Sequence, residues 1–232
     1  MKIVITGATK GIGRAIAEKF ASEGFDLAVS ARTAADLEEM RETLEAKYGI
    51  SVLTGVADMR IKSEVLAFAQ QVTSQWGAVD VLVNNAGVFV PGEISAEPEG
   101  NLERMIETNL YSAYHFTRAM LPTMLEKRSG HIFNMCSIAS VIAYPNGGSY
   151  SISKFALLGF SKVLREELKQ QGIRVTAILP GATWSDSWAG VDLPASRLML
   201  ASDIALAVWS AWQMSPAAVV EELIVRPQLG DL

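Results

Sequence analysis

The sequence contains very few of the residues that form disulfides and metal sites. Its 232 residues include one cysteine and two histidines. A single cysteine excludes an internal disulfide and is typical of proteins from reducing compartments. One cysteine and two histidines also provide too few ligands for an ordinary zinc site, so we expect no metal.

Charged residues and long hydrophobic runs are scarce too. Only 19% of the residues are charged and the net charge is −5, which gives no electrostatic basis for binding nucleic acid. The most apolar late stretch, residues 198–214, is interrupted by Asp203 and is too short and too polar to span a membrane. Strand-like residues begin at Lys2, so we expect no signal peptide. We therefore expect a cytoplasmic protein that binds neither nucleic acid nor a membrane.

What the sequence does contain is a regular alternation of β-rich and amphipathic runs, in a chain that is 50% hydrophobic. The expected strands are residues 2–6, 25–30, 50–56, 79–85, 131–137, 173–180 and 222–226. The expected helices are residues 12–22, 34–49, 62–75, 102–127, 150–171 and 203–213. This alternation predicts an α/β fold with a single doubly wound parallel sheet of Rossmann type, about seven strands wide, and helices on both faces.

The first expected strand ends in the glycine-rich run TGATKGIG, residues 6–13. Glycines allow a tight turn and a close approach to a pyrophosphate, which the N-terminus of the next helix stabilises. An ordinary glycine-rich turn is the alternative, but a strand before and a helix after favour dinucleotide binding. No Gly-Lys-Ser/Thr follows at the right offset, which excludes a Walker phosphate loop. The cofactor contacts predicted here are Gly7, Thr9, Lys10, Gly11, Ile12 and Gly13.

The end of the second strand distinguishes between the two nicotinamide cofactors. An acid there would accept hydrogen bonds from a ribose 2′-hydroxyl, whereas an arginine would suit a 2′-phosphate. The sequence has Ser-Ala-Arg-Thr at residues 30–33 and no acid. Either Arg32 or Lys10 alone could be a solvated surface cation. Together they predict NADP(H), with Arg32 and Thr33 as contacts.

Residues 150–154 read YSISK, which places Tyr150 and Lys154 on one face of a helix. Chance produces such pairs on many surface helices, so the other motifs decide. In order along the chain these are TGATKGIG, Asp58, NNAG at 84–87, Asn109, Ser137, YSISK and PGATWS at 180–185. This ordered set resembles the short-chain dehydrogenase/reductase family over nearly the whole chain. The resemblance implies that residues 1–232 form a single NADP(H)-binding Rossmann-fold reductase domain.

The resemblance also implies the rest of the cofactor site. The carboxylate of Asp58 would bind the adenine amino group. The NNAG motif would line the cofactor and hold the central strand through Asn84, Asn85, Ala86 and Gly87. The nicotinamide would be held by Pro180, Gly181, Thr183 and Ser185.

The catalytic residues implied by the resemblance are Asn109, Ser137, Tyr150 and Lys154. A free phenol has a pKa of about 10, which a nearby ammonium and the oxidised nicotinamide would lower. Tyr150 would then exchange a proton with the substrate oxygen as hydride moves to or from the carbon. Lys154 would also hold the nicotinamide ribose, and Ser137 would hydrogen-bond the substrate oxygen. Asn109 would hold a water that links Lys154 to solvent.

The substrate is less closely defined. Residues 30–38, 180–188 and 219–232 are similar to bacterial sepiapterin-reductase-like members of the family. That similarity implies a small dicarbonyl with an aromatic ring system, stacked on Phe89, Tyr144, Trp184 and Trp188. The same aromatics would accept other hydrophobic ketones. No cluster of Lys or Arg lies near residues 182–193, which argues against a bulky acyl-carrier substrate.

Several alternatives stay open. The general motifs also fit a 3-oxoacyl carrier-protein reductase. Two alternatives come from other functional classes: a catalytically inactive NADP(H)-binding regulator and a nucleotide-sugar epimerase.

The family resemblance further implies a homotetramer or homodimer, formed through the helices at 102–127 and 151–171. We expect Cys136 and His131 to have packing roles.

Overall fold

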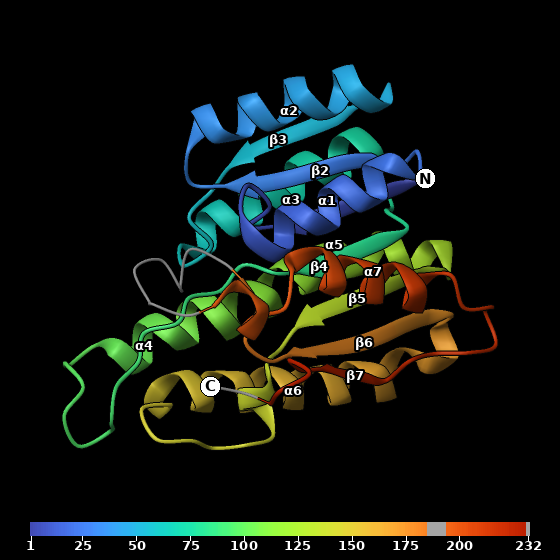
Figure 1. Ribbon diagram of the computed structural model, residues 1–232. Coiled ribbons are helices and arrows are strands. Elements are labelled where there is room, and N and C mark those ends of the chain that lie inside the picture. Colours follow the sequence, from blue (N-terminus) through green and yellow to red (C-terminus); the bar gives the residue numbers. More distant parts are fainter. Residues whose placement is uncertain (185–193, 231–232) are drawn as a thin grey trace.

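A parallel sheet forms the centre of the computed structural model, which describes residues 1–184 and 194–230 (Figure 1). Within these residues the sheet has seven strands in the order β3-β2-β1-β4-β5-β6-β7. Their bounds are β1 Lys2–Thr6, β2 Asp26–Ala31, β3 Val52–Val56, β4 Val81–Asn84, β5 Gly130–Met135, β6 Ile173–Pro180 and β7 Glu222–Val225. All neighbouring strands pair in parallel. The predicted fold class is confirmed.

Helices cover both faces of the sheet and bury its apolar side chains (Figure 1). One face packs against α1 (Gly11–Ser22), α2 (Ala34–Tyr48) and α7 (Ala201–Trp212). The other packs against α3 (Lys62–Trp76), α5 (Ser112–Lys127) and α6 (Gly148–Leu168). Burial on both sides explains why the strands are almost continuously apolar. None of the described helices is long and apolar enough to cross a bilayer.

The carboxyl ends of the strands meet at one edge of the sheet, at the left in Figure 1. The strand order reverses direction at β1, because β2 lies on one side of it and β4 on the other. In such sheets the loops diverge at this point and leave a crevice, where ligands bind. The ligand site is therefore expected between the loops that follow β1 and β4.

The long helix predicted for 102–127 is interrupted by a wider turn. It consists of α4 (Asn101–Ile106), a π-helical turn η1 (Glu107–Tyr111) and α5. A π turn contains one more residue than an α turn, and such turns are frequent at functional sites. Asn109 lies within it and is 1% exposed. The hydrophobic period of the sequence does not reveal this insertion.

Two other element ends differ from expectation near the site. β5 ends at Met135, so Ser137 lies beyond the strand and caps a short 3₁₀ turn, η2 (Ile138–Ser140). Its hydroxyl accepts a hydrogen bond from the N–H of Ala139 at 3.1 Å. α6 begins at Gly148, so Tyr150 lies in the first turn of the helix.

The residues expected to have packing roles are buried. His131 is fully buried and its Nε2 lies 2.7 Å from the Thr176 hydroxyl. Burial lowers the pKa of His131 to about 2, so the ring is neutral in the folded protein. Cys136 is also buried, which raises the pKa of its thiol to about 11 and makes it a poor nucleophile.

Candidate active site

A cleft of about 1010 Å³ runs along the carboxyl ends of the strands. Every predicted cofactor-binding residue within the described part of the chain lines this cleft, except Asn84. Those residues are Gly7, Thr9, Lys10, Gly11, Ile12, Gly13, Arg32, Thr33, Asp58, Asn85, Ala86, Gly87, Tyr150, Lys154, Pro180, Gly181 and Thr183. Ser185 and Trp188 lie outside the described residues. The structure thus brings together residues that follow β1, β2, β3, β4 and β6 with two residues of α6, Tyr150 and Lys154.

Asn84 departs from expectation because its side chain points into the core. Its Nδ2 donates to Thr117 Oγ1 at 2.8 Å and to Asn134 Oδ1 at 2.7 Å. Side chains alternate between the two faces of a sheet, and this one faces α5 rather than the cleft. The role in holding the central strands fits these contacts, and the role in lining the cofactor does not.

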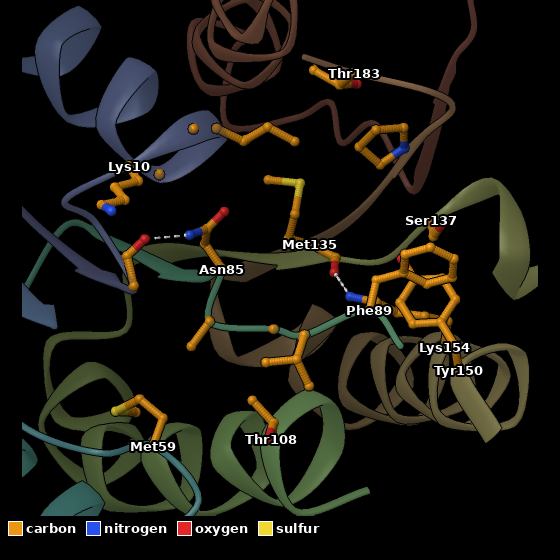
Figure 2. A pocket seen from close by; sticks show the side chains of 18 of the residues that line it. Lys10, Met59, Asn85, Phe89, Thr108, Met135, Ser137, Tyr150, Lys154 and Thr183 are labelled. Carbon is orange, nitrogen blue, oxygen red and sulfur yellow. Dashed lines mark hydrogen bonds between the residues drawn. The ribbon is translucent and has the colours of Figure 1, made fainter. Parts of the chain in front are cut away.

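The glycine turn after β1 is closed by Asn85, shown in Figure 2. Asn85 Nδ2 donates to Gly7 O at 2.8 Å and to Thr6 O at 3.0 Å. A Cβ at Gly13 would lie 2.3 Å from Gly7 O and 2.4 Å from Asn85 Nδ2, so only glycine fits. The first turn of α1 therefore packs directly against the ends of β1 and β4, and its residues Gly11, Ile12 and Gly13 line the cleft. Its free N–H groups suit a pyrophosphate.

Charged side chains surround the end of the cleft near β2 and β3. Arg32 and Lys10 line it, as the sequence predicted. The Asp58 carboxylate is held by Arg60, whose Nη2 lies 2.8 Å from Oδ2 and whose backbone N lies 3.0 Å from Oδ1. Hydrogen bonds from Arg60 lower the pKa of Asp58, which keeps the carboxylate charged. Sequence reasoning missed Arg60, although it follows Asp58 by only two residues.

Tyr150, Lys154 and Ser137 meet at the other end of the cleft (Figure 2). Lys154 lies one turn after Tyr150 on α6, with its Nζ 5.7 Å from the centre of the phenol ring. The ammonium donates a hydrogen bond to Met135 O at 2.8 Å. Phe89, from the loop after β4, packs edge-on against Tyr150 with ring centres 4.8 Å apart. The predicted pair does share one face of the helix.

Burial dominates the electrostatics of this pair in the protein without cofactor. Burial raises the pKa of Tyr150 to about 12, while a hydrogen bond with Ser137 acts in the opposite direction. Burial lowers the pKa of Lys154 to about 8. Desolvation is the largest influence on both groups, and the hydrogen bond of the ammonium is to a backbone carbonyl. The chain by itself does not produce a low phenol pKa.

Asn109 lies behind the cleft wall rather than in it. Its Oδ1 accepts a hydrogen bond from the N–H of Val88 at 2.8 Å, and its Nδ2 donates to Val88 O at 3.0 Å. Nδ2 also donates to Ser153 Oγ at 2.8 Å, and that hydroxyl donates to Tyr150 O at 2.7 Å. The side chain thus joins the loop after β4 to the start of α6.

The substrate end is only partly as predicted. Phe89 and Tyr144 line the cleft, but Trp184 is 51% exposed and is not among the described lining residues. Lining residues that the sequence did not flag include Asp36, Met59, Arg60, Val88, Pro91, Arg104, Thr108, Met135, Ile138, Ile142 and Arg226. Thr108 and Arg104 lie one helical turn apart beside Asn109, and Arg226 follows the last strand. Helical spacing and the strand-end rule could have found these three.

The lowered pKa of Lys154 predicts an effect on stability. The unfolded chain binds this proton up to a pH of about 10.5, while the folded chain releases it near pH 8. Wild-type stability should rise with pH across this window, because the unfolded state there binds more protons. Lys154→Met should raise the free energy of unfolding at pH 7 by about 1–3 kcal/mol, because it removes a buried charge. The increase should be smaller at pH 11, where the lysine is largely neutral in both states. Urea unfolding at both pH values measures the change in stability, with Lys162→Met at an exposed position as the control. A Lys154→Met protein that is less stable than the wild type at pH 7 contradicts the prediction.

Comparison with known proteins identifies the family. A family model described as short chain dehydrogenase matches residues 1–193. A sepiapterin reductase of Chlorobaculum tepidum is 36% identical over 99% of this chain and 97% of its own length. A 3-oxoacyl-[acyl-carrier-protein] reductase of Staphylococcus epidermidis is 36% identical over 79% of this chain and 75% of its own. An alcohol dehydrogenase of Thermococcus sibiricus, solved with 5-hydroxy-NADP, superposes with a TM-score of 0.92 at 29% identity, covering 100% of this chain and 98% of that one. The chain belongs to the short-chain dehydrogenase family of oxidoreductases.

Proposed function

We propose that the protein is an NADP(H)-dependent reductase that converts a small ketone or dicarbonyl to an alcohol, with Tyr150 as the proton donor. The observation that carries this proposal is the meeting of Tyr150, Ser137 and Lys154 at one end of a cleft whose other end carries Arg32 and Lys10. The cofactor is NADP(H), in keeping with the similar structure solved with an NADP derivative.

The described residues fit this cofactor. The open N-terminus of α1 would hold the pyrophosphate, and Arg32 with Lys10 would hold the 2′-phosphate. The Asp58 carboxylate, which Arg60 already orients, would accept a hydrogen bond from the adenine amino group. The strand-end residues Pro180, Gly181 and Thr183, together with Ser185, would seat the nicotinamide. When bound, the cofactor supplies the hydride that the carbonyl carbon accepts.

The chain supplies orientation and the proton. Ser137 and Tyr150 hydrogen-bond the carbonyl oxygen, which fixes the substrate and polarises the bond that is reduced. A phenol with a pKa of about 12 is fully protonated near neutrality, so the proton needed in the reducing direction is present before the reaction. The proton passes from the phenol oxygen to the substrate oxygen and completes the alcohol. Lys154, on the same face of α6, offsets the negative charge left on the phenolate.

The substrate end of the cleft favours a flat or apolar carbonyl compound. Its walls include Phe89, Tyr144, Ile138 and Ile142, so aromatic and aliphatic surface is available on several sides. The sepiapterin reductase relative supports a substrate with a ketone attached to a planar ring. Trp184 and Trp188 are proposed to add stacking surface.

Two other functions are kept as alternatives. The Staphylococcus relative favours a 3-oxoacyl carrier-protein reductase, and Arg226 at the cleft offers a cation that such an anionic partner could use. An inactive NADP(H)-binding regulator is disfavoured by the complete set of catalytic residues.

We also propose a cytoplasmic homotetramer or homodimer, since Ile152, Phe155 and Val163 leave an apolar face of α6 exposed.

Tyr150→Phe tests the proton donor. Loss of the hydroxyl should lower turnover at least ~10²-fold, the usual effect of losing a general acid. NADPH affinity, measured from cofactor fluorescence, should stay close to that of the wild type. A folded Tyr150→Phe protein with near-normal turnover would remove Tyr150 from the mechanism.

Arg32→Ala tests the 2′-phosphate contact. A charge-assisted hydrogen bond contributes roughly 1.5–3 kcal/mol, so the preference for NADPH over NADH should fall by about ten- to a hundredfold. The exposed Arg41→Ala, on the neighbouring helix α2, is the control and should keep the preference. An affinity ratio unchanged in Arg32→Ala means that the phosphate binds elsewhere.

The substrate class is tested by competition between carbonyl compounds. Catalytic efficiency should be higher with sepiapterin or a phenyl diketone than with an acetoacetyl thioester. Tyr144→Ala should reduce this preference about two- to tenfold, since an aromatic contact contributes ~0.5–1.5 kcal/mol. Trp184→Ala tests the proposed stacking surface of Trp184 in the same way. If the thioester is clearly preferred and neither variant changes the ratio, the carrier-protein alternative replaces the aromatic one.

A further inference from the structure

The loop between β4 and α4 carries a carboxylate, Glu97, that contacts the first turn of α6. Its Oε1 accepts a hydrogen bond from the hydroxyl of Ser149, a residue only 1% exposed. Its Oε2 is buried and has no hydrogen-bond partner within the part of the chain that the structure describes. Covering a carboxylate costs free energy, and this one contacts the residue that directly precedes Tyr150.

The loop and the helix approach each other very closely at this point. A Cβ at Gly148, the first residue of α6, would lie 2.4 Å from Gly92 O and 3.2 Å from Glu97 Oε2. The N–H of Gly92 also donates to Asn146 O at 3.0 Å. The loop is thus attached to the start of α6 at two points, and Gly148 provides the room.

The position of the carboxylate suits the start of a helix. The first N–H groups of a helix have no intrahelical acceptors, and they form the positive end of its dipole. The N-cap of α6 is Gly147, which makes no side-chain capping bond. Glu97 therefore supplies, from a separate loop, the negative charge that a capping side chain would ordinarily supply. A negative charge is favourable near a helix N-terminus, which opposes the cost of covering this carboxylate.

Both attached segments carry residues of the candidate active site. Tyr150 directly follows Ser149 in the first turn of α6, and Phe89 in the loop packs against the Tyr150 ring. Asn109 holds the near end of the same loop through Val88. We propose that Glu97 is a positioning residue that clamps residues 88–97 to the first turn of α6 and so fixes the Tyr150 phenol relative to the Phe89 wall. The inference rests on the proposed function in that Tyr150 is the proton donor.

Glu97→Ala and Ser149→Ala should each lower kcat by about 10- to 100-fold, since a small misplacement of a catalytic group has effects of this size. The double variant should be no slower than the slower single variant, because both remove one contact. Glu97→Gln keeps an acceptor for Ser149 and should lose only about two- to fivefold. Glu99→Ala removes an exposed carboxylate from the same loop and should match the wild type.

Rates are expressed per site that binds NADPH, so that partial unfolding does not imitate a loss of positioning. NADPH affinity should stay within about twofold of wild type, and amide exchange in residues 88–97 and 147–151 should accelerate in Glu97→Ala. Unchanged exchange in both segments would overturn the clamp. Faster exchange with an unchanged kcat would overturn its role in positioning. A wild-type protein that reduces no carbonyl compound contradicts the proposed function instead, and the exchange data then decide the clamp alone.

Discussion

The hydrogen bonds of Asn85 join the end of β4 to the turn after β1, and the position of the whole site depends on this junction. Parallel strands bring all their carboxyl ends to one edge, and the order of the sheet reverses between β1 and its neighbours β2 and β4. Asn85 joins the end of β4 to the turn after β1 through Thr6 O and Gly7 O. The N–H groups of Asn85 and Ala86 both donate to Thr6 Oγ1. These hydrogen bonds fix the distance between the loops after β1 and β4, and the cleft lies between these loops.

Burial is the main electrostatic influence at the catalytic end. Lys154 is 5% exposed and makes its hydrogen bond to a backbone carbonyl, so the protein holds an ammonium where it is poorly solvated. The same surroundings make the phenol of Tyr150 a weaker acid. Both shifts oppose the charged forms, so the ammonium of Lys154 loses its proton more easily and the phenol of Tyr150 loses its proton less easily. Such shifts are typical of functional sites.

Much of the fold and site was predictable because the signals are local. Alternating apolar runs gave the strands, and the glycine turn, Arg32 and the YSISK pair gave both ends of the cleft. The remaining features depend on contacts between distant segments. Nothing adjacent in sequence indicates that Asn84 faces Thr117 or that Glu97 reaches Ser149, and the spacing of Tyr150 and Lys154 carries no information on their desolvation. The predicted substrate contact of Trp184 stays a prediction, since this residue is not among the described lining residues of the cleft.

The π turn at Glu107–Tyr111 has a consequence for how the sequence can change in length. The extra residue in this turn sets the angular offset between α4, which approaches α6, and α5, whose Phe116 and Met120 fill the core. Removing a single residue here would turn one helix against the other by about 100°, since each residue of an α-helix advances by that angle. Either the Asn109 bonds or the core contacts of α5 would then be lost. The segment is therefore fixed in its number of residues even where the identity of an exposed one, such as Tyr111, is free to vary.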